Sequence, residues 1–331
     1  MATLKEIAEA THVSIRTVSR ALNDSGYVNP QKKVKILTVA EKLMYRPNRI
    51  AKSLRMQKSF EIIVVTGSLD ELHIAKLAGL EQAMREAGYS VSMLFLNHQD
   101  ESVKEKYYDR ELIHEIDYRH PAALALLAFP DNEIIPWVRY LNGNNIPYIV
   151  FDTSAQVDTV RIDRTYGIYS AVMYLAEKGK KRIAYLGPRV NDTRTAGYRQ
   201  AMEELKQKPI FLRIEQAEIG QFDPAPGLSR YLQMKERPDA VQAYSDEVAM
   251  KFMSKLHDLS IKIPLELSVI GFDNRWAAAL SWPRLTTVAQ PNYKLGIASA
   301  EILLRKIRGE TPPKEGWSRI LPTELIIRDS A

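Results

Sequence analysis

Short, nearly continuous apolar runs return along most of this chain, and they limit its possible folds more than any other feature. The runs lie at residues 62–65, 91–96, 123–128, 148–151, 182–187, 240–244 and 267–273. Runs of this length without polar alternation are typical of strands buried on both faces of a parallel sheet. Because segments with helical spacing separate the runs, the pattern predicts repeated β-α-β units.

The repeats form two series, which predict two lobes. Helices are expected up to Gly88 and from Glu101, Asp131, Tyr166, Asn191, Pro226 and Glu247, with an extended stretch at 210–214. We therefore expect an α/β domain of two doubly wound parallel-sheet lobes. Folds of this kind bind ligands in the cleft between the lobes.

Composition bounds the remaining possibilities. A chain of 331 residues with 45% hydrophobic residues is long enough for a small module beside one large two-lobed unit. The absence of cysteine excludes disulfides, thiolate metal sites and a cysteine nucleophile. No apolar run approaches the roughly 20 residues that a membrane helix needs. We expect a cytoplasmic protein without membrane association.

Positive charge is concentrated near the N-terminus. The formal net charge is +6, but residues 1–60 hold twelve Lys or Arg against four Asp or Glu, so residues 61–331 sum to −2. A basic cluster is often only a solvated surface. Because the whole surplus lies in one small part of the chain, the distribution favours a polyanion as a partner.

The first residues predict two short helices joined by a tight turn. Thr3, followed three residues later by Glu6, forms a capping box that opens the first helix. Ser14 is the expected N-cap of the second helix. Helices joined this closely cross steeply, and the small inward residues Ala8 and Val18 permit the approach. The pattern predicts a helix-turn-helix, although a plain scaffold corner has the same spacing.

A third helix is predicted to begin at Pro30, because proline is favoured in a first helical turn. We expect this helix to pack against the first two. The residues expected on its apolar side are Val28, Val34, Leu37 and Leu43.

The segment TLKEIAEATHVSIRTVSRALN, which begins at Thr3, resembles the DNA-binding head of the LacI/GalR family of transcriptional regulators. In that family a V-S-x-x-T-V-S-R segment forms the recognition helix. His12 stands where the family usually has a glycine with positive φ, a conformation in which His is enriched. The resemblance implies that residues 1–45 form a helix-turn-helix domain whose partner is a double-stranded DNA operator.

The resemblance also implies which side chains of this head contact DNA. Base contacts in the major groove are expected from Ile15, Arg16 and Arg20. Short hydroxyls are better suited to phosphate oxygens, and such contacts are expected from Ser14, Thr17 and Ser19.

Residues 46–60 follow as a hinge and linker. The sequence YRPNRIAKSLRMQKS, from Tyr45, resembles the hinge of the same family, Y-x-P-N-x-x-A-x-x-L. A short basic helix is marginal in water, so a disordered linker is the alternative, and the two states can alternate. The resemblance implies that two hinges fold on operator DNA, pair through Ala51 and wedge Leu54 into the minor groove. The residues expected on hinge phosphates are Asn48, Arg49 and Lys52.

Residues 61–331 resemble the effector-binding and dimerisation domain of the family. The implied lobes are about 61–160 with 291–321, and about 161–290 with 322–331. RTAGY, at 194–198, resembles an R-x-x-G-[FWY] segment whose arginine reaches ligand hydroxyls or carboxylates. VIGFDN contains Asp273, which matches an aspartate that accepts hydrogen bonds from vicinal hydroxyls. The expected effector-binding residues are Arg194, Asp273, Phe222, Asp152 and Ser245.

Other readings of these residues remain open. Arg194 can form a surface ion pair, and Phe222 can fill the core instead of stacking on a ligand ring. The segment GSLDELH after the first strand departs from the family, and its Asn-Asp pair reads Ser245, Asp246. These departures affect the pocket walls, so a sugar or sugar derivative is expected as effector without a narrower identity.

An enzyme is the first alternative, and the sequence gives it no support. The nucleotide-binding motifs G-x-G-x-x-G and the P-loop are absent, as are G-x-S-x-G and H-E-x-x-H. Five histidines lie scattered without metal-ligand spacing: His73, His98, His114, His120 and His257. We expect no catalytic residues, no cofactor and no metal.

The favoured function is a homodimeric repressor that binds a near-palindromic operator and is controlled by a small effector. The family's tetramers carry a further C-terminal segment, whereas this chain ends soon after TELIIRDS, so a dimer is expected. An effector that weakens DNA binding and one that strengthens it are both compatible with the sequence. The alternative is a solute-binding protein of a transport system, which shares the two-lobed fold but has no helix-turn-helix.

Overall fold

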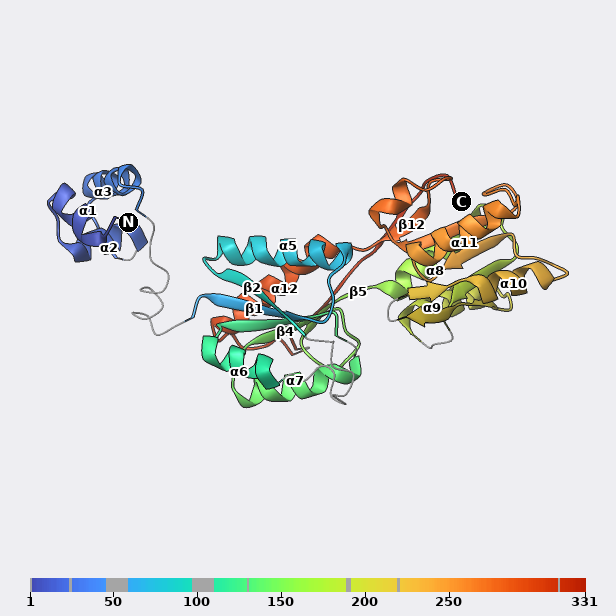
Figure 1. The fold of residues 1–331 in the computed structure, drawn as a ribbon, viewed down its shortest axis with the longest axis horizontal. Helices are drawn as coiled ribbons and strands as arrows, with labels where there is room; N and C mark the ends of the chain where they lie inside the picture. The colour runs from blue at the N-terminus through green and yellow to red at the C-terminus, as the bar shows by residue number, and fades with distance from the viewer. Residues whose placement is uncertain are drawn as a thin grey trace. The chain divides into compact units, whose positions relative to one another are not determined.

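The computed structural model describes residues 2–23, 26–45, 59–96, 110–129, 131–188, 192–218, 221–314 and 316–331. The chain divides into two compact units, residues 1–60 and 61–331. Figure 1 shows the first unit as a small group of helices at the blue end of the chain and the second as layers of strands and helices.

The N-terminal unit contains three helices within the residues described: α1 (Leu4–Thr11), α2 (Ile15–Asn23) and α3 (Pro30–Lys42). The predicted capping box is confirmed, because Thr3 Oγ1 accepts the Glu6 N–H at 3.3 Å and the Glu6 carboxylate accepts the Thr3 N–H at 2.8 Å. The tight turn is confirmed as well. His12 ends α1 in the left-handed conformation, with φ 56° and ψ 43°.

The predicted apolar side of α3 is wrong. Val34 is 65% exposed and Leu37 44%, whereas Ile36 and Ala40 are buried against Ile7 of α1. Leu43 is exposed too, and of the expected set Val28 packs partly against the core. The apolar residues of α3 lie on two different sides of the helix. Contact with α1 and α2 decides which side packs, and the sequence pattern of the helix alone cannot show this.

The first lobe of the larger unit is built around one parallel sheet. Its elements are β1 (Glu61–Thr66), α5 (Glu71–Glu86), β2 (Ser90–Phe95), α6 (Arg110–Arg119), β3 (Ala123–Leu127), α7 (Asp131–Gly143), β4 (Tyr148–Phe151), β5 (Thr159–Ile162), α12 (Asn292–Ile307) and β13 (Ser318–Leu321). Over the described residues the strand order is β13-β5-β4-β3-β1-β2, and every pairing is parallel.

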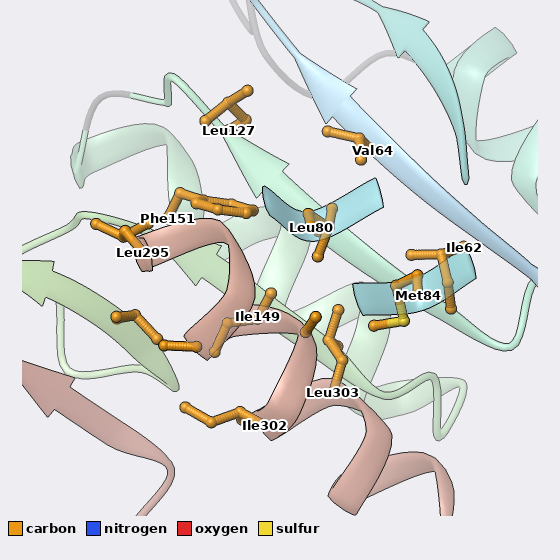
Figure 2. Close-up of a cluster of buried hydrophobic side chains, with 14 of the residues drawn as sticks. Ile62, Val64, Leu80, Met84, Leu127, Ile149, Phe151, Leu295, Ile302 and Leu303 are labelled. Carbon is orange, nitrogen blue, oxygen red and sulfur yellow. The ribbon is translucent and has the colours of Figure 1, made fainter. Parts of the chain in front are cut away.

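Both faces of this sheet are covered by helices, as Figure 1 shows. The alternation within β1 assigns Ile62 and Val64 to the face under α5 and α12, and Ile63 and Val65 to the face under α6 and α7. Figure 2 shows the first of these clusters, in which Leu303 of α12 meets side chains from β1 and α5. Complete burial of these four residues of β1 explains their unbroken apolar run.

The second lobe repeats this arrangement. Its elements are α8 (Arg164–Glu177), β6 (Ile183–Gly187), α9 (Thr193–Glu204), β7 (Ile210–Arg213), β8 (Glu215–Glu218), β9 (Gln221–Asp223), α10 (Ala225–Gln233), β10 (Ala240–Ala243), α11 (Asp246–Asp258), β11 (Ser268–Asp273), the 3-10 turn η1 (Trp276–Ala279), β12 (Thr286–Ala289) and β14 (Glu324–Ile326). The order is β14-β12-β11-β10-β6-β7 in the described residues, with only β14 antiparallel. Helices α8 and α9 cover one face, and α10 and α11 the other.

The two doubly wound lobes confirm the predicted fold class, with some differences in the elements. Strands β5 and β13 and the β8-β9 hairpin were not expected from the pattern, because they are short and lack continuous apolar runs. The helix expected from Glu101 begins at Arg110 in the described part, and residues 101–109 lie outside it.

The chain passes between the two sheets at three points. The first crossing follows β5, the second lies between β12 and α12, and the third lies between β13 and β14. Two of the crossings are joined by hydrogen bonds, since Asp163 N–H donates to Leu321 O at 2.9 Å and Thr323 Oγ1 donates to Asp163 O at 3.3 Å. Because all three segments connect the lobes, a change in the angle between the lobes involves each of them.

Helices α5 and α12 approach so closely that glycine is required at their contact. A Cβ atom at Gly296 would lie 1.9 Å from Lys76 O, and one at Gly79 would lie 2.1 Å from Tyr293 O. Both atoms belong to the backbone of the facing helix and cannot rotate away. The contact fixes the position of α5, and thus of the side chains that it directs toward the second lobe.

We expect Gly296→Ala to lower the free energy of unfolding by about 1–3 kcal/mol, the usual cost of overpacking a rigid contact. Gly143→Ala is the matched control, because nothing lies within 4 Å of its added Cβ. That control should leave stability unchanged or raise it through helix propensity, by up to ~1 kcal/mol. Urea unfolding of both variants measures the difference, and equal stabilities would contradict the close packing.

Candidate functional site

Two regions carry the residues predicted to have functional roles. The first is the exposed side of α2 in the helical unit. Val18 and Ala21 point into the core and are buried, whereas Ile15, Arg16 and Arg20 are exposed. The three predicted base-contacting residues therefore share the solvent side of one helix, with two guanidinium groups one helical turn apart.

The hydroxyl residues beside them also serve the local fold. Ser14 Oγ accepts the Thr17 N–H at 3.1 Å, which confirms the predicted N-cap, and lies 2.8 Å from Thr17 Oγ1. Ser14 is exposed, and Thr17 and Ser19 are half-buried. Phosphate contacts by these hydroxyls stay a prediction.

The hinge predictions fall on residues 46–58, which lie outside the described residues. This concerns the phosphate, pairing and wedge roles predicted for Asn48, Arg49, Ala51, Lys52 and Leu54.

The second region is a cavity of about 290 Å³ between the two lobes of the larger unit. Side chains from α5 and the ends of β3 and β4 line it from the first lobe, and residues of α8, α9, α11 and β11 line it from the second. All five predicted effector-binding residues lie on its wall: Asp152, Arg194, Phe222, Ser245 and Asp273.

Asp152 follows β4 and is held by two cations. Arg164, at the start of α8, donates to its two oxygens at 2.7 and 2.5 Å, and Lys76 Nζ of α5 donates at 3.2 Å. Burial alone would raise the pKa of Asp152, but Lys76 and Arg164 outweigh it and hold the pKa well below its usual value. The carboxylate is ionised, and its pairing with Arg164 joins an element of the first lobe to one of the second.

Asp273 ends β11 and occupies the corresponding position in the second lobe. Its Oδ1 accepts hydrogen bonds from Arg194, at 3.2 Å, and from Gln290. Burial raises the pKa of Asp273, an effect that Arg194 and two other arginines oppose. The Arg194 guanidinium also lies 4.3 Å from the Tyr244 ring centroid and 4.6 Å from that of Phe272, which fixes it by cation–π contact.

Both carboxylate residues have an uncommon backbone conformation. Asp152 has φ 56° and Asp273 has φ 121°. Residues other than glycine in such conformations cost of order 1–3 kcal/mol each and cluster at functional sites. A positive φ thus occurs where a strand ends at the cavity in each lobe, and each of the two residues places a carboxylate on the cavity wall.

Arg275 links the lobes at the mouth of the cavity. It extends from the loop after β11, and its guanidinium donates to Asp70 at 2.7 Å and to Glu71 at 3.4 Å. Asp70 is the N-cap of α5, so this contact acts directly on the first helix of the other lobe. Burial raises the pKa of Asp70, but hydrogen bonds from His73 and Arg275 keep the pKa below its usual value.

The remaining two predicted residues have structural roles as well. Ser245 is the N-cap of α11, where its Oγ accepts the Val248 N–H at 3.3 Å. Phe222, on β9, packs edge-on against Tyr244 with ring centroids 5.5 Å apart. Both readings of Phe222 are thus compatible with its position, since it lines the cavity and also contacts the lobe core.

Sequence reasoning missed several charged groups of the cavity. Lys76 interrupts the otherwise apolar stretch IAKLAGL and is only 5% exposed in the structure. A charged residue in such a stretch is the sequence signal that could have identified it. Arg164 follows a strand that was not expected, and Arg275 follows the expected VIGFD segment by two residues. Their partners are distant in sequence, so no local pattern identifies the ion pairs.

A further carboxyl, Asp246, lies behind the cavity wall and is fully buried. It accepts hydrogen bonds from Thr287 Oγ1 at 2.5 Å and from the Arg275 N–H at 2.7 Å. Burial, together with the neighbouring charge of Asp273, raises the pKa of Asp246 to about 7. Its protonation state therefore changes near neutral pH, next to the backbone of the residue that links the lobes.

No cluster of potential metal ligands occurs among the residues described. In the same part of the chain, no helix combines the length and apolar character needed to cross a bilayer.

We expect Asp246→Asn to weaken the pH dependence of stability. The folded-state pKa of about 7 exceeds the ordinary value, so the protonated carboxyl stabilises the fold fully below about pH 4 and this contribution is lost as the pH rises through 7. Between about pH 5 and 8 the unchanged chain should lose on the order of 2 kcal/mol more unfolding free energy than the variant.

Asp258→Asn is the control for this experiment, because Asp258 is exposed at the end of the same helix, α11. Chemical denaturation at several pH values should show that the unfolding free energy of the control depends on pH as that of the unchanged chain does. The assignment fails if Asp246→Asn retains that dependence too.

Comparison with known proteins places both units. The family described as "Bacterial regulatory proteins, lacI family" matches residues 3–48, and "Periplasmic binding protein-like domain" matches residues 172–331. The chain is 31% identical over 348 residues to the "Probable HTH-type transcriptional repressor ExuR" of Bacillus subtilis (strain 168), covering 100% of this chain and 98% of that protein. It is 29% identical over 335 residues to the "HTH-type transcriptional regulator RegA" of Clostridium saccharobutylicum, covering 99% and 98%.

Solved structures agree on the fold. The Lac repressor dimer bound to operator and the anti-inducer ONPF has a TM-score of 0.75 at 24% identity, covering 99% of this chain and 98% of that one. The complex of the transcriptional regulator CelR with cellobiose has a TM-score of 0.68 at 23% identity, covering 100% of both chains. These relatives are regulators and not enzymes, and the match at the head separates the chain from a solute-binding protein. The chain belongs to the lacI family of bacterial regulatory proteins, as a DNA-binding transcriptional regulator.

Proposed function

We propose that this regulator is a repressor that binds a near-palindromic operator as a homodimer and responds to a small polar effector in the interlobe cavity. The observation that carries the proposal is the pair of exposed guanidinium groups on α2, in a segment where residues 1–60 hold the chain's whole positive surplus. The name of the Bacillus subtilis relative, a probable repressor, supports the direction of regulation.

Base reading is assigned to the exposed side of α2. An arginine at the start of a recognition helix can bond a guanine edge through two donors, which is worth about 1–3 kcal/mol of discrimination. Arg16 and Arg20 fit this role, and Ile15, 49% exposed, offers an apolar contact such as a thymine methyl group. Ser14, Thr17 and Ser19 are assigned to phosphates, which orient the head without reading sequence.

The hinge assignments complete the DNA-binding part of the proposal. Phosphate contacts are assigned to Asn48, Arg49 and Lys52, pairing to Ala51 and the minor-groove wedge to Leu54. The family resemblance of the hinge sequence supports these assignments.

A dimer is proposed because helix-turn-helix heads read half-sites in pairs. Large apolar side chains are exposed within one seven-residue segment of the second lobe: Trp276 at 70%, Leu280 at 72% and Trp282 at 90%. Exposed apolar groups of this size are typical of association surfaces. The Lac repressor named above is described as a dimer on its operator.

The effector is proposed to contact both lobes. Asp273 accepts hydrogen bonds from ligand hydroxyls, Arg194 donates hydrogen bonds to ligand hydroxyl or carboxylate oxygens, and Phe222 packs against a ring of the ligand. Asp152 and Ser245 line the remaining wall. Two neighbours of the same fold are described as complexes with cellobiose and with D-xylulofuranose, which supports a sugar or sugar derivative.

Coupling between the cavity and the head is proposed to act through the ion pairs that join the lobes. Arg275 and Arg164 both bond carboxylates of the first lobe. An effector that contacts these groups binds one lobe angle better than another, and only such a difference can shift the equilibrium. Couplings of this kind are typically about 1–3 kcal/mol. The angle between the lobes then sets the spacing of two hinges in a dimer.

We expect Arg20→Ala to reduce discrimination between the selected operator and variants with one base pair changed, by about 1–3 kcal/mol at a single position. The operator is first obtained by selection from random DNA with the full chain. Lys42→Ala, on the exposed end of α3, is the control and should weaken every duplex by a similar small factor. Equal loss on operator and random DNA in Arg20→Ala would exclude base reading by this residue.

A further inference from the structure

We propose that the effector is a polyhydroxy carboxylic acid of about hexose size, whose carboxylate binds between Lys76 and Arg164. The inference rests on the proposed function, because it concerns the same cavity, and it narrows the effector from polar compounds in general to acids. Charge balance, unused donors and the size of the cavity support it in turn.

Charge is unbalanced at one end of the cavity. Asp152 supplies one negative charge to the two cations that bond it, so the group formed by Lys76, Asp152 and Arg164 carries a net charge of +1. The Lys76 and Asp152 side chains are 7% and 5% exposed, and that of Arg164 is 23% exposed. A buried surplus charge is unfavourable unless an opposite charge reaches it.

The other charged groups on the wall already have partners. Asp273 is bonded by Arg194 and Gln290. Glu247 pairs with Lys251 at 2.6 Å. Arg275 pairs with both Asp70 and Glu71, so this group carries a net charge of −1, on side chains that are 26–36% exposed. Burial lowers the pKa of the neighbouring His73, which favours its neutral form. The buried surplus is therefore located at Lys76 and Arg164, because among the described residues neither of them bonds a carboxylate other than Asp152. The opposite charge of the Arg275 group lies on side chains that are partly exposed to solvent, which screens it.

Lys76 also has donors to offer. An ammonium group carries three N–H donors, and the bond to Asp152 uses one of them. Its helix is fixed by the glycine contact with α12, where a Cβ at Gly296 would meet Lys76 O at 1.9 Å. The ammonium group thus reaches the cavity from a rigid position, which favours a specific ion pair over a mobile one.

The size and the opposite end of the cavity define the rest of the ligand. The cavity that Lys76 lines has a volume of about 290 Å³, which suits a ligand the size of one sugar unit. A second cavity of about 810 Å³ shares Asp152, Arg164 and Arg194 with it but is not lined by Lys76. At the second lobe, Asp273, Gln290 and Ser245 provide the acceptors and donors that hydroxyl groups need. A surplus of one positive charge matches one carboxylate, whereas a phosphate ester brings about −1.5 to −2 charges at neutral pH.

Pairs of compounds that differ only in the acid group test the proposal. The pairs are glucuronate with glucose, galacturonate with galactose, and gluconate with glucitol, with glucose 6-phosphate as a further arm. Thermal shift and calorimetric titration of the full chain measure binding. In at least one pair the acid should bind about tenfold tighter or more than its neutral partner, the effect of one charge-assisted hydrogen bond.

Two variants then locate the carboxylate. Lys76→Met should weaken binding of the preferred acid about tenfold and change binding of its neutral partner little. Lys306→Met is the matched control, because Lys306 is also largely buried, pairs with Asp158 at 2.6 Å and lies outside the cavity. That control should keep the preference for the acid. Retained operator binding by each variant shows that it is folded.

The outcomes separate this inference from the proposed function. Equal or tighter binding of every neutral partner, tighter binding of glucose 6-phosphate, or no binding of any acid overturns the inference, and the comparison needs only the unchanged chain. An acid preference that survives Lys76→Met overturns the assigned site. Operator selection with the same preparation tests the repressor role independently, so a protein that binds an operator but prefers a neutral sugar refutes the acid and not the regulator.

Discussion

The carboxylate of Asp152, shared between Lys76 and Arg164, is the interaction on which the functional part of this structure depends. It brings the end of β4, the helix α5 and the first residue of α8 to one point, and two of these belong to the first lobe and one to the second. The ion pairs therefore define where the lobes meet. The two cations and one carboxylate also give this end of the cavity a net positive charge.

Connection between the lobes has two kinds of components. The three backbone crossings, two of which are joined through Asp163, keep the lobes attached at every angle. Arg275, bonded to Asp70 at the start of α5, is a side-chain contact that can be made or broken. Because the cavity lies between these components, a ligand bound there can contact both lobes and select an angle, which is the physical requirement for the proposed control of the DNA-binding head.

The sequence predicts most of the fold because its strongest signals are local. Apolar runs predict the central strands of both sheets, and the capping box at Thr3 and the turn at His12 depend on neighbours within a few residues. The side of α3 that packs could not be predicted, since two apolar spacings compete and only contact with α1 and α2 decides. Strands β5 and β13 pair residues that lie 159 positions apart, in a register that no local pattern records.

The candidate cavity was predictable only in part for the same reason. Arg194 and Asp273 belong to segments that resemble a family, so their neighbourhood identifies them. Lys76 and Arg164 acquire their role from Asp152, which lies 76 residues from Lys76 and 12 from Arg164, beyond the reach of a local pattern. Asp246 titrates near neutral pH because of complete burial beside Asp273, which is a property of the folded state alone.

The central claim is that one chain couples ligand binding between its lobes to operator binding by its head. Linkage makes this coupling reciprocal, so the operator must change the affinity for the effector by the same factor by which the effector changes affinity for the operator. Calorimetric titration of the effector into the full chain, with and without saturating operator, measures the factor directly. The account predicts a change of about 5- to 150-fold, and an effector affinity that is the same on and off the operator would contradict it.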